Sequence, residues 1–527
     1  MTELTGTFAL VRLALRLDRV RLPIWVLGLA VMPVGTAGQY MKLYPTDESI
    51  RRISGVVTNP SLVALNGPLF RATLGGLTAW KILATELILV SLMSVLTVVR
   101  HTRADEEAGR LELVRAGAVG RRAPLVAALV TAGVANVAVT ILTALGLAGA
   151  GLPLSGSVAL GAAIGATGLI FATVAAVAAQ LTESARSATA IAAAVLGASY
   201  LLRAAGDTGP AWAAWASPLG WAIRMRAFAG ERWWVLALAV GLAAVLLGVA
   251  VTLAGHRDLG AGLVQQRPGR AEAAPGLRSP IALAWRLQRG ILFGWLAGMV
   301  LWGFSLGGAA DGIGAAIGKN EAVSELLARM GGSKGLVDAY LAAVLGITGL
   351  VVAAYAIQAT LRLRAEETSG RLEPVLATRA GRVQWAISHL SIAVLGTAAL
   401  LAVAGGSAGL AYGLRIHDVG GQFPRLLGGA LVQSPAAWLL AGLGVALFGL
   451  APRLVTLTWA SLIACVVLAE AGALFGLSQW LVDASPFTHV PKLPGAAFAV
   501  TPVAWLTVLA AGLTAAGLAG FRRRDIG

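Results

Sequence analysis

A charged motif of ten residues occurs twice in this chain. Residues 103–112 are RADEEAGRLE and residues 364–373 are RAEETSGRLE, and the two align without a gap. In each copy a glutamate precedes an arginine by four residues, which supports a short exposed helix by a few tenths of a kcal/mol per pair. A glycine at the same position in both copies costs a helix about 1 kcal/mol. It therefore indicates either a close backbone approach or a break between two helical pieces.

A solvated loop would explain the arginines of these motifs but not the same acidic, glycine and leucine positions in both copies. We therefore predict that each motif is a docking element for a cytoplasmic partner. The residues that would carry this role are Glu106, Glu107, Gly109, Arg110, Leu111 and Glu112 in the first copy, and Glu366, Glu367, Gly370, Arg371, Leu372 and Glu373 in the second.

Three ionisable residues, Lys81, Glu86 and Glu470, lie inside long apolar runs. Charged groups in an apolar environment are unfavourable, so Glu86 and Glu470 are candidates for a substrate path. Glu86 is close enough along its helix to pair with Lys81 or to extend toward the helix end, whereas Glu470 has no evident partner. A hydrogen bond that packs one helix against another explains either residue equally well, and both alternatives stay open.

Two further segments contain Ala-Ser-Pro, at residues 216–218 and 484–486. Tryptophans beside the first are typical of anchors at a membrane boundary. A Ser-Pro pair in an apolar stretch also indicates a chain that enters the membrane and turns back. The anchor and gate interpretations are equally supported. The residues that would line a substrate path here are Trp215, Pro218, Trp221, Pro486 and Phe487.

Other chemistry is not indicated. The sequence lacks the G-x-x-x-x-G-K-[ST] pattern that binds nucleotide phosphates, and Gly318-Lys319-Asn320 has neither its first glycine nor its hydroxyl residue. The five histidines are scattered without metal-ligand spacing, and the single cysteine excludes an internal disulfide. We predict that the chain is not an enzyme and binds no metal or cofactor itself.

The composition indicates which solvent surrounds these residues. Of 527 residues, 57% are hydrophobic and only 13% are charged, about half of what a soluble domain needs. The net charge of +16 comes almost entirely from arginines at the ends of apolar runs. That placement favours a membrane protein of defined orientation over a nucleic-acid-binding protein.

Twelve apolar runs are long enough to cross a bilayer. They lie at residues 22–39, 78–100, 123–150, 156–180, 187–204, 233–255, 290–309, 340–361, 384–412, 426–450, 454–476 and 499–521. The most basic segments all fall on one side of the membrane if these runs are counted in order, which predicts that both termini are cytoplasmic.

The two motifs belong to a longer internal repeat. Arg16-Leu17-x-Arg19 matches Arg286-Leu287-x-Arg289, and the ends of the two halves match as Arg257-Asp258-Leu259-Gly260 and Arg524-Asp525-Ile526-Gly527. We predict a first six-helix repeat at 1–264, a cytoplasmic linker at 265–279 and a second six-helix repeat at 280–527. An even number of helices in each makes the repeats parallel. Basic amphipathic stretches at 4–21 and 280–289 predict an interfacial elbow helix before each.

These residues give the chain a resemblance to the permease subunits of ATP-binding-cassette exporters of the ABC-2 type. It is most similar to the large duplicated actinobacterial permeases known as tetronasin-type or polyketide-antibiotic exporters. The features that carry the resemblance are the basic elbows, the E-x-x-G-R-L-E motifs, the Ser-Pro segments and the terminal Phe521-Arg-Arg-Arg-Asp525-Ile526. The resemblance implies an all-α membrane fold with elbow helices, coupling helices at the two motifs and external re-entrant hairpins.

The resemblance also implies a function. The chain would export hydrophobic or amphipathic compounds, as in antibiotic or multidrug efflux, from a bacterial inner membrane. ATP and magnesium would be bound by two copies of a separate ATPase subunit. Most ABC-2 permeases are single six-helix units, whereas this chain fuses two, and Thr368 and Pro374 replace Glu107 and Leu113 in the second copy. The main alternative is a proton-driven antiporter that uses Glu86 or Glu470; an integral-membrane enzyme lacks the polar clusters it would need.

Overall fold

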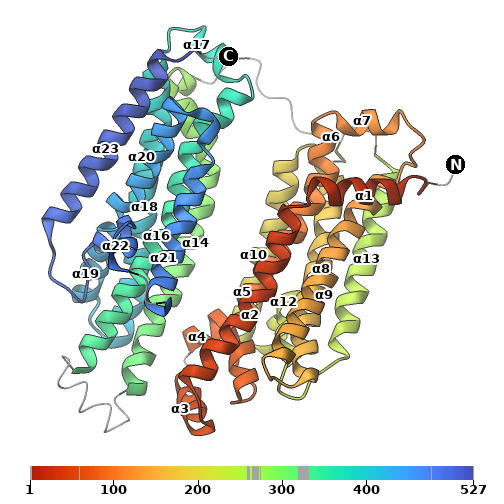
Figure 1. Ribbon diagram of the computed structural model, residues 1–527, viewed down its shortest axis with the longest axis vertical. Helices are drawn as coiled ribbons and strands as arrows, with labels where there is room; N and C mark the ends of the chain where they lie inside the picture. Colours follow the sequence, from red (N-terminus) through yellow and green to blue (C-terminus); the bar gives the residue numbers. More distant parts are fainter. Residues whose placement is uncertain are drawn as a thin grey trace. The chain divides into compact units, whose positions relative to one another are not determined.

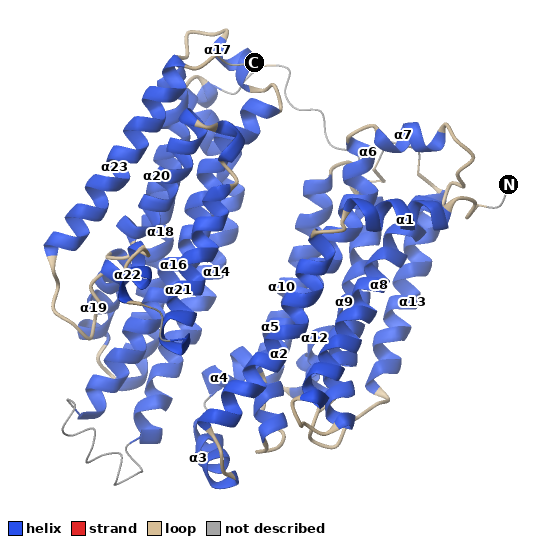
Figure 2. Ribbon diagram, viewed as in Figure 1, coloured by secondary structure: helices blue, strands red, loops and turns tan. Residues whose placement is uncertain are grey.

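The computed structural model describes residues 3–57, 60–257, 262–263, 272, 275–317, 332–475 and 478–525. Within these ranges all regular structure is helical (Figure 2), and eleven helices are long and apolar enough to cross a membrane. The chain divides into two compact units, Met1–Gly269 and Arg270–Gly527. The predicted linker at 265–279 lies mostly outside the described residues. The predicted all-α membrane fold is confirmed.

The first unit contains six long apolar helices at the places predicted for them. They are α2 (Arg21–Leu43), α5 (Leu74–Val99), α8 (Ala123–Gly149), α9 (Leu154–Leu181), α10 (Ala185–Thr208) and α13 (Val235–Gly255). Helix α9 is the central one, because it packs against α5, α8, α10 and α13. Shorter helices lie at both ends of the unit (Figure 1).

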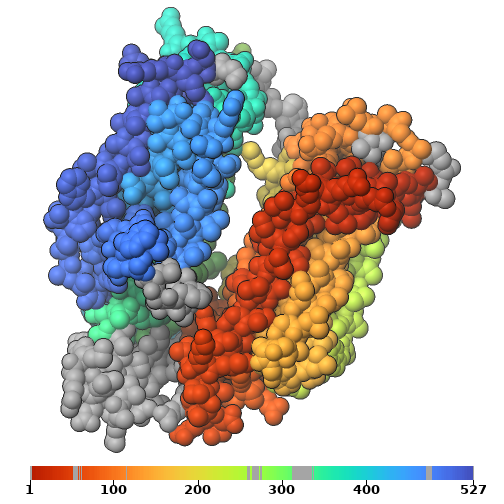
Figure 3. Space-filling view, viewed as in Figure 1, coloured from red at the N-terminus to blue at the C-terminus, as the bar shows by residue number. Residues whose placement is uncertain are grey.

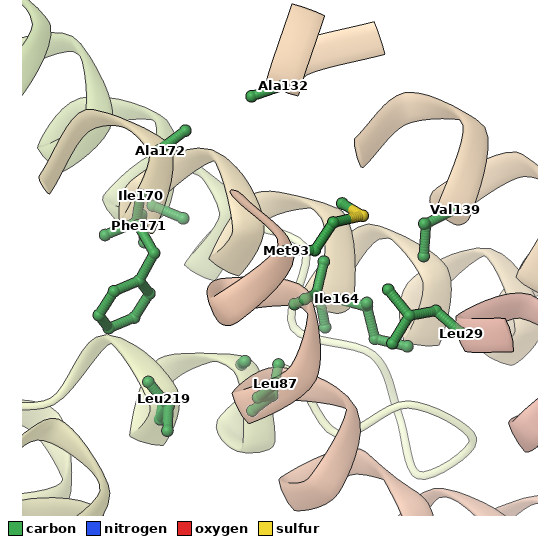
Figure 4. Close-up of a cluster of buried hydrophobic side chains, with 14 of the residues drawn as sticks. Leu29, Leu87, Met93, Ala132, Val139, Ile164, Ile170, Phe171, Ala172 and Leu219 are labelled. Atoms are coloured by element: carbon green, nitrogen blue, oxygen red, sulfur yellow. The ribbon is translucent and has the colours of Figure 1, made fainter. Parts of the chain in front are cut away.

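Close packing between helices holds the core of the first unit together. Leu87, Met93 and Ile164 meet where α5 and α9 pack (Figure 4). A Cβ at Gly161 of α9 would come within 2.5 Å of the carbonyl oxygen of Thr140 on α8, so the two backbones touch there. Lipid supplies no hydrophobic force between helices, so close packing of this kind is what associates them.

The second unit is built from α14 (Pro280–Ile317), α16 (Gly332–Thr368), α18 (Arg382–Ile416), α19 (Val419–Leu431), α20 (Ser434–Leu450), α21 (Leu457–Phe475) and α23 (Val500–Arg523). The run predicted at 426–450 is divided between α19 and α20, which together form one apolar span. The run predicted at 454–476 is α21, whose apolar part Leu457–Ala469 is shorter than the other spans. Helices therefore occupy all twelve predicted places.

The two predicted elbows differ. In the first unit α1 (Thr7–Leu17) is a separate helix that lies across the end of the unit (Figure 1). In the second, residues 280–289 are the first turns of the continuous 38-residue helix α14, so the prediction of a separate elbow there is wrong. Asp18 ends helix α1 in the first copy, and the residue aligned with it in the second copy is Gln288. Glutamine favours a helix interior more than aspartate does, and it lets α14 continue.

Candidate functional site

Each charged motif bends at its glycine. In the first copy a π-helix, η1 (Arg100–Ala104), leads into α6 (Asp105–Glu107), and α7 (Arg110–Arg115) follows after the bend. Gly109 has φ +68° and Gly370 has φ +69°, values that non-glycine residues rarely adopt. A Cβ on either would meet nothing within 4 Å. The glycines therefore make a break between helical pieces, and the close backbone approach is excluded.

The second motif has the same division. Helix α16 ends at Thr368, and the short helix α17 (Leu372–Leu376) begins after Gly370. Figure 1 shows α6 and α7 at the end of the first unit that carries α1, and α17 at the end of the second unit that carries the C-terminus. Each motif thus forms a short helical element at one end of its unit.

A buried cluster of charges ties the first element to the last helix of its unit. Glu106 Oε2 accepts from Arg103 Nη1 at 3.0 Å, and Glu106 also receives two bonds from Arg257, at 2.9 and 3.0 Å. Arg103 Nε donates to the carbonyl of Ala179, and Arg257 Nε to the side chain of Gln180. The Glu106 side chain is only 5% exposed. Because Arg257 follows α13 directly, this cluster joins the motif to both α13 and α9.

The second unit repeats the cluster. Glu367 Oε2 pairs with Arg364 Nη1 at 2.7 Å, and Glu367 Oε1 pairs with Arg524, which follows α23. The Arg524 guanidinium also lies 5.1 Å from the ring centre of Phe448 and 5.7 Å from that of Phe521. We call each Arg–Glu–Arg group a clamp, made of Arg103, Glu106 and Arg257 in the first unit, and of Arg364, Glu367 and Arg524 in the second.

A third arginine supports each clamp in the same way. Arg121 Nη2 donates to the backbone carbonyl of Arg257 at 2.9 Å, and Arg382 Nη1 donates to that of Arg524 at 2.8 Å. The sequence contained a signal for these contacts, since the matching ends of the two halves include Arg257 and Arg524. Nothing in a sequence pattern shows that those ends fold back onto the motifs, so sequence reasoning missed both residues.

The predicted pair of Glu106 and Arg110 is not formed. Arg110 Nη2 instead pairs with Asp105 Oδ1 at 2.8 Å. The left-handed turn at Gly109 breaks the helix between the two residues, so they no longer share a helical face. Glu106 is directed into the clamp, and Arg110 remains 63% exposed.

The predicted pair of Glu367 and Arg371 is absent for the same reason. Arg371 Nε donates to Ser369 Oγ at 2.8 Å and lies 3.7 Å from a carboxylate oxygen of Glu366. Glu367 belongs to the clamp, and the turn at Gly370 separates it from Arg371. In both copies the arginine after the glycine is therefore exposed, and its acidic partner is the residue five positions before it.

The structure divides the predicted docking residues into two groups. Glu106, Leu111, Glu366, Glu367 and Leu372 are buried or nearly so, and they hold each element in place. The exposed group, which a partner could contact, is Glu107, Arg110, Glu112, Arg371 and Glu373. Glu107 also accepts a hydrogen bond from the backbone N–H of Ala185, at the start of α10.

Comparison with known proteins decides the family. The chain is 45% identical over 526 residues to the multidrug efflux system permease protein Rv1217c of Mycobacterium tuberculosis (strain ATCC 25618 / H37Rv), and the alignment covers 99% of this chain and 95% of that protein. The chain belongs to this family of multidrug efflux permeases. The family model of the C-terminal domain of the multidrug efflux system permease Rv1217c matches residues 277–522. The chain is therefore a multi-pass membrane permease.

Beside the first clamp of this permease, α1 is attached to the motif. The Asp18 carboxylate at the end of α1 bonds to His101 Nε2 at 2.6 Å, and His101 Nδ1 lies 3.8 Å from Asp105. A pocket of about 250 Å³ lies between α1, η1, α7 and α8, and Figure 3 shows α1 in red beside α7 in orange. Asp18 and His101 were not among the predicted site residues, because they are 83 residues apart in the chain.

Of the permease's ionisable residues in apolar runs, Glu86 is fully buried in α5. Neither of its carboxylate oxygens has a hydrogen-bond partner among the described residues, so the pair with Lys81 is not formed. Lys81 is exposed, five positions earlier on the same helix. The side chain of Glu470 lies outside the described residues.

The first Ser-Pro segment of the permease folds as two short helices, α11 (Ala211–Trp215) and α12 (Pro218–Arg224). Buried Ser217 caps α12 and donates to the carbonyl of Ser199 at 2.6 Å. Trp221 donates to the carbonyl of Trp215, whose ring stacks on that of Trp234. Trp215 and Trp221 are thus partly buried members of the fold.

In the second unit, Pro486 is buried at the start of a 3-10 turn, η4 (Pro486–His489). Phe487 is partly buried and packs against a cluster that includes Val490 and Leu506. Both residues contact the permease's own core, as their counterparts in the first unit do.

Proposed function

We propose that this permease is the membrane subunit of an ATP-driven exporter of the ABC-2 type, of the tetronasin or polyketide-antibiotic class. It would export hydrophobic or amphipathic compounds. The observation that carries the proposal is the repeated clamp, which fixes an element with an exposed arginine and glutamate at one end of each unit. Two ATPase subunits, which bind ATP and magnesium, dock there, one on α6–α7 and one on α17.

The clamps support a mechanism of coupling. When ATP draws the two ATPases together, each pulls on its docked element. Because Glu106 is bonded to Arg257 at the end of α13, and Glu367 to Arg524 at the end of α23, the displacement moves a membrane helix as well as a surface loop. Buried charge-assisted hydrogen bonds of this kind are short and directional. A displacement of the motif should therefore displace the bonded helix end by a similar amount.

We further propose that the clamp end of each unit is cytoplasmic in the bacterial inner membrane, with both termini on that side. Arginines gather at this end of the first unit, including Arg103, Arg110, Arg121, Arg122 and Arg257. Such a bias is typical of cytoplasmic loops. The two six-helix repeats, 1–264 and 280–527, would pivot about the linker at 265–279 and alternate access to the substrate. Trp215, Pro218, Trp221, Pro486 and Phe487 lie in the external segments where the path would open.

Purification of the tagged full-length chain from its own membranes in mild detergent tests the proposal. We expect a soluble P-loop ATPase to be recovered at about two copies per chain. Charge reversal of both exposed arginines, R110E with R371E, should abolish this recovery because it reverses the charge that each motif presents to its partner. The matched control is R415E. It changes an exposed arginine at the C-terminal end of α18, away from the motif that precedes this helix. Recovery of the intact chain alone, without any ATPase, contradicts the proposal.

Buried Glu86 favours a second candidate function, proton-driven antiport, because an unpartnered carboxyl in a membrane helix is suited to carry a proton. Vesicles that contain this chain, with and without the ATPase, test it. Dye efflux on a proton gradient without ATP, abolished by E86Q, would support antiport. Efflux that requires ATP and the ATPase, and that E86Q leaves intact, would reject it.

A further inference from the structure

A long apolar groove runs along the first unit between α8 and α13, with α9 as its floor. Its volume is about 730 Å³. The groove is lined by aliphatic side chains that include Leu129 and Val130 of α8, Leu169 of α9, and Ala243 and Leu247 of α13. None of the clamp residues or the predicted substrate-path residues contributes to it.

One end of the groove is charged. Arg122, just before α8, pairs through Nη1 with Glu3 Oε2 at 2.7 Å, and both side chains line the groove. The N-terminal segment is held there by two backbone bonds, Gly120 N to Thr5 O and Arg122 N to Glu3 O. A guanidinium has five donors, and among the described residues only Glu3 bonds to the Arg122 side chain. Arg122 therefore keeps donors for a ligand.

The dimensions of the groove match those of an acyl chain. On α13 it extends from Ala239 to Val251, which is roughly 18 Å along a helix at 1.5 Å per residue. One leaflet of the hydrocarbon core is about 15 Å thick. A single fatty tail that enters from one surface would therefore extend along the length of the groove, with its head group beside Arg122.

The charge at that end selects the head group. Arg121, the neighbour of Arg122 in the chain, is exposed, so the groove opens at a basic surface. An arginine guanidinium binds phosphate with two parallel hydrogen bonds. We infer that the groove is a binding site for an anionic membrane phospholipid, whose acyl chain lies between α8 and α13 and whose phosphate pairs with Arg122 in competition with Glu3.

The competition gives the site a distinctive test, because R122Q and E3Q break the same ion pair. If that ion pair only holds the N-terminal segment in place, R122Q and E3Q should change lipid retention equally. If Arg122 binds phosphate, R122Q should weaken retention of the lipid, whereas E3Q should strengthen it because the competing carboxylate is gone.

The experiment uses the full-length chain in detergent, with phosphatidylglycerol and phosphatidylcholine as probes and native mass spectrometry to count the bound lipid. We expect the wild-type chain to prefer phosphatidylglycerol, R122Q to retain at least threefold less of it, and E3Q to retain more. Filling the groove with A243F should abolish the preference. The matched control A237F, at an exposed α13 position outside the groove, should leave the preference unchanged.

Equal retention by R122Q and E3Q, or no preference between the two lipids, overturns the inference. So does displacement of bound phosphatidylglycerol by an exported dye at equal concentration in the wild-type chain, because the groove would then be a substrate site. The measurement needs neither ATP nor an ATPase, so its outcome is independent of the proposed function.

Discussion

The two clamps are alike, but their surroundings differ. In the first unit the motif is tied to the elbow helix, because Asp18 at the end of α1 binds His101 and His101 approaches Asp105. In the second unit the residue aligned with His101 is Arg362, which pairs with Glu366 at 2.6 Å. The structure thus keeps the link from motif to last helix in both units, and joins the motif to an elbow through His101 only in the first.

Gln288, the counterpart of Asp18, has a different partner. Its side chain bonds to His389 of α18 at 3.1 Å, in a buried position within continuous helix α14. The clamp is therefore common to both motif elements of this permease, and the elbow contact is specific to the first. If the proposed coupling holds, the first element should move together with α1 and α13, and the second with α16 and α23.

The largest expected effect comes from neutralising the clamp glutamates. In E106Q, the buried side chains of Arg103 and Arg257 lose the carboxylate that both bind, which should destabilise the first unit by about 3 kcal/mol. In E367Q the loss should be closer to about 1 kcal/mol, because the Arg364 side chain is 32% exposed and water can solvate it. Thermal unfolding in detergent measures both, and exposed E373Q is the control. Equal losses would show that the two clamps are energetically equivalent.

The next effect concerns the elbow contact. Asp18 is 1% exposed and holds both His101 and Arg100, so D18A should destabilise by about 2 kcal/mol. Its counterpart Q288A removes one neutral hydrogen bond and should cost about 1 kcal/mol. Melting temperatures of the two variants test the order. A larger loss of stability in Q288A than in D18A would refute the view that this contact contributes more in the first unit.

Alanine substitution should lower the stability of the protein equally at the two glycine bends. Alanine at Gly109 or Gly370 keeps the space but disfavours the left-handed backbone, so G109A and G370A should each lose about 1 kcal/mol. The control is G381A, where φ is −71° and a Cβ meets nothing within 4 Å. A stability loss confined to one of the two bends would mean that the motifs fold differently in solution.

The smallest effect on stability is expected at the outer face of the elements. Leu113 is 79% exposed, and its counterpart Pro374 is also exposed, so L113D and P374D should each change stability by less than about 0.5 kcal/mol. If the ATPase packs on α7 through Leu113, L113D should reduce its recovery more than P374D does. A116D, an exposed change in the same loop, serves as control. Equal recovery in all three variants would remove Leu113 from the docking face.

Much of the molecule follows from local patterns. Runs of apolar residues longer than a bilayer can be read without knowledge of their neighbours, because lipid demands the same composition and length of every spanning helix. For this reason a helix lies at each of the twelve predicted places in the described part of the chain, although α14 extends beyond its run and the run at 426–450 is divided. The bend at each motif was also among the predictions, since a glycine between helix-forming residues weakens any helix there.

Only the tertiary structure decided which charges meet. The spacing of Glu106 and Arg110 predicts a pair, yet Glu106 is bonded to Arg257, 151 residues away. Likewise, Asp18 meets His101 across 83 residues. The sequence by itself determined where the long apolar helices lie and which glycines could interrupt the motifs. The partners of the buried charges depend on which helix ends the packing brings together, and that is set by contacts between segments far apart in the chain.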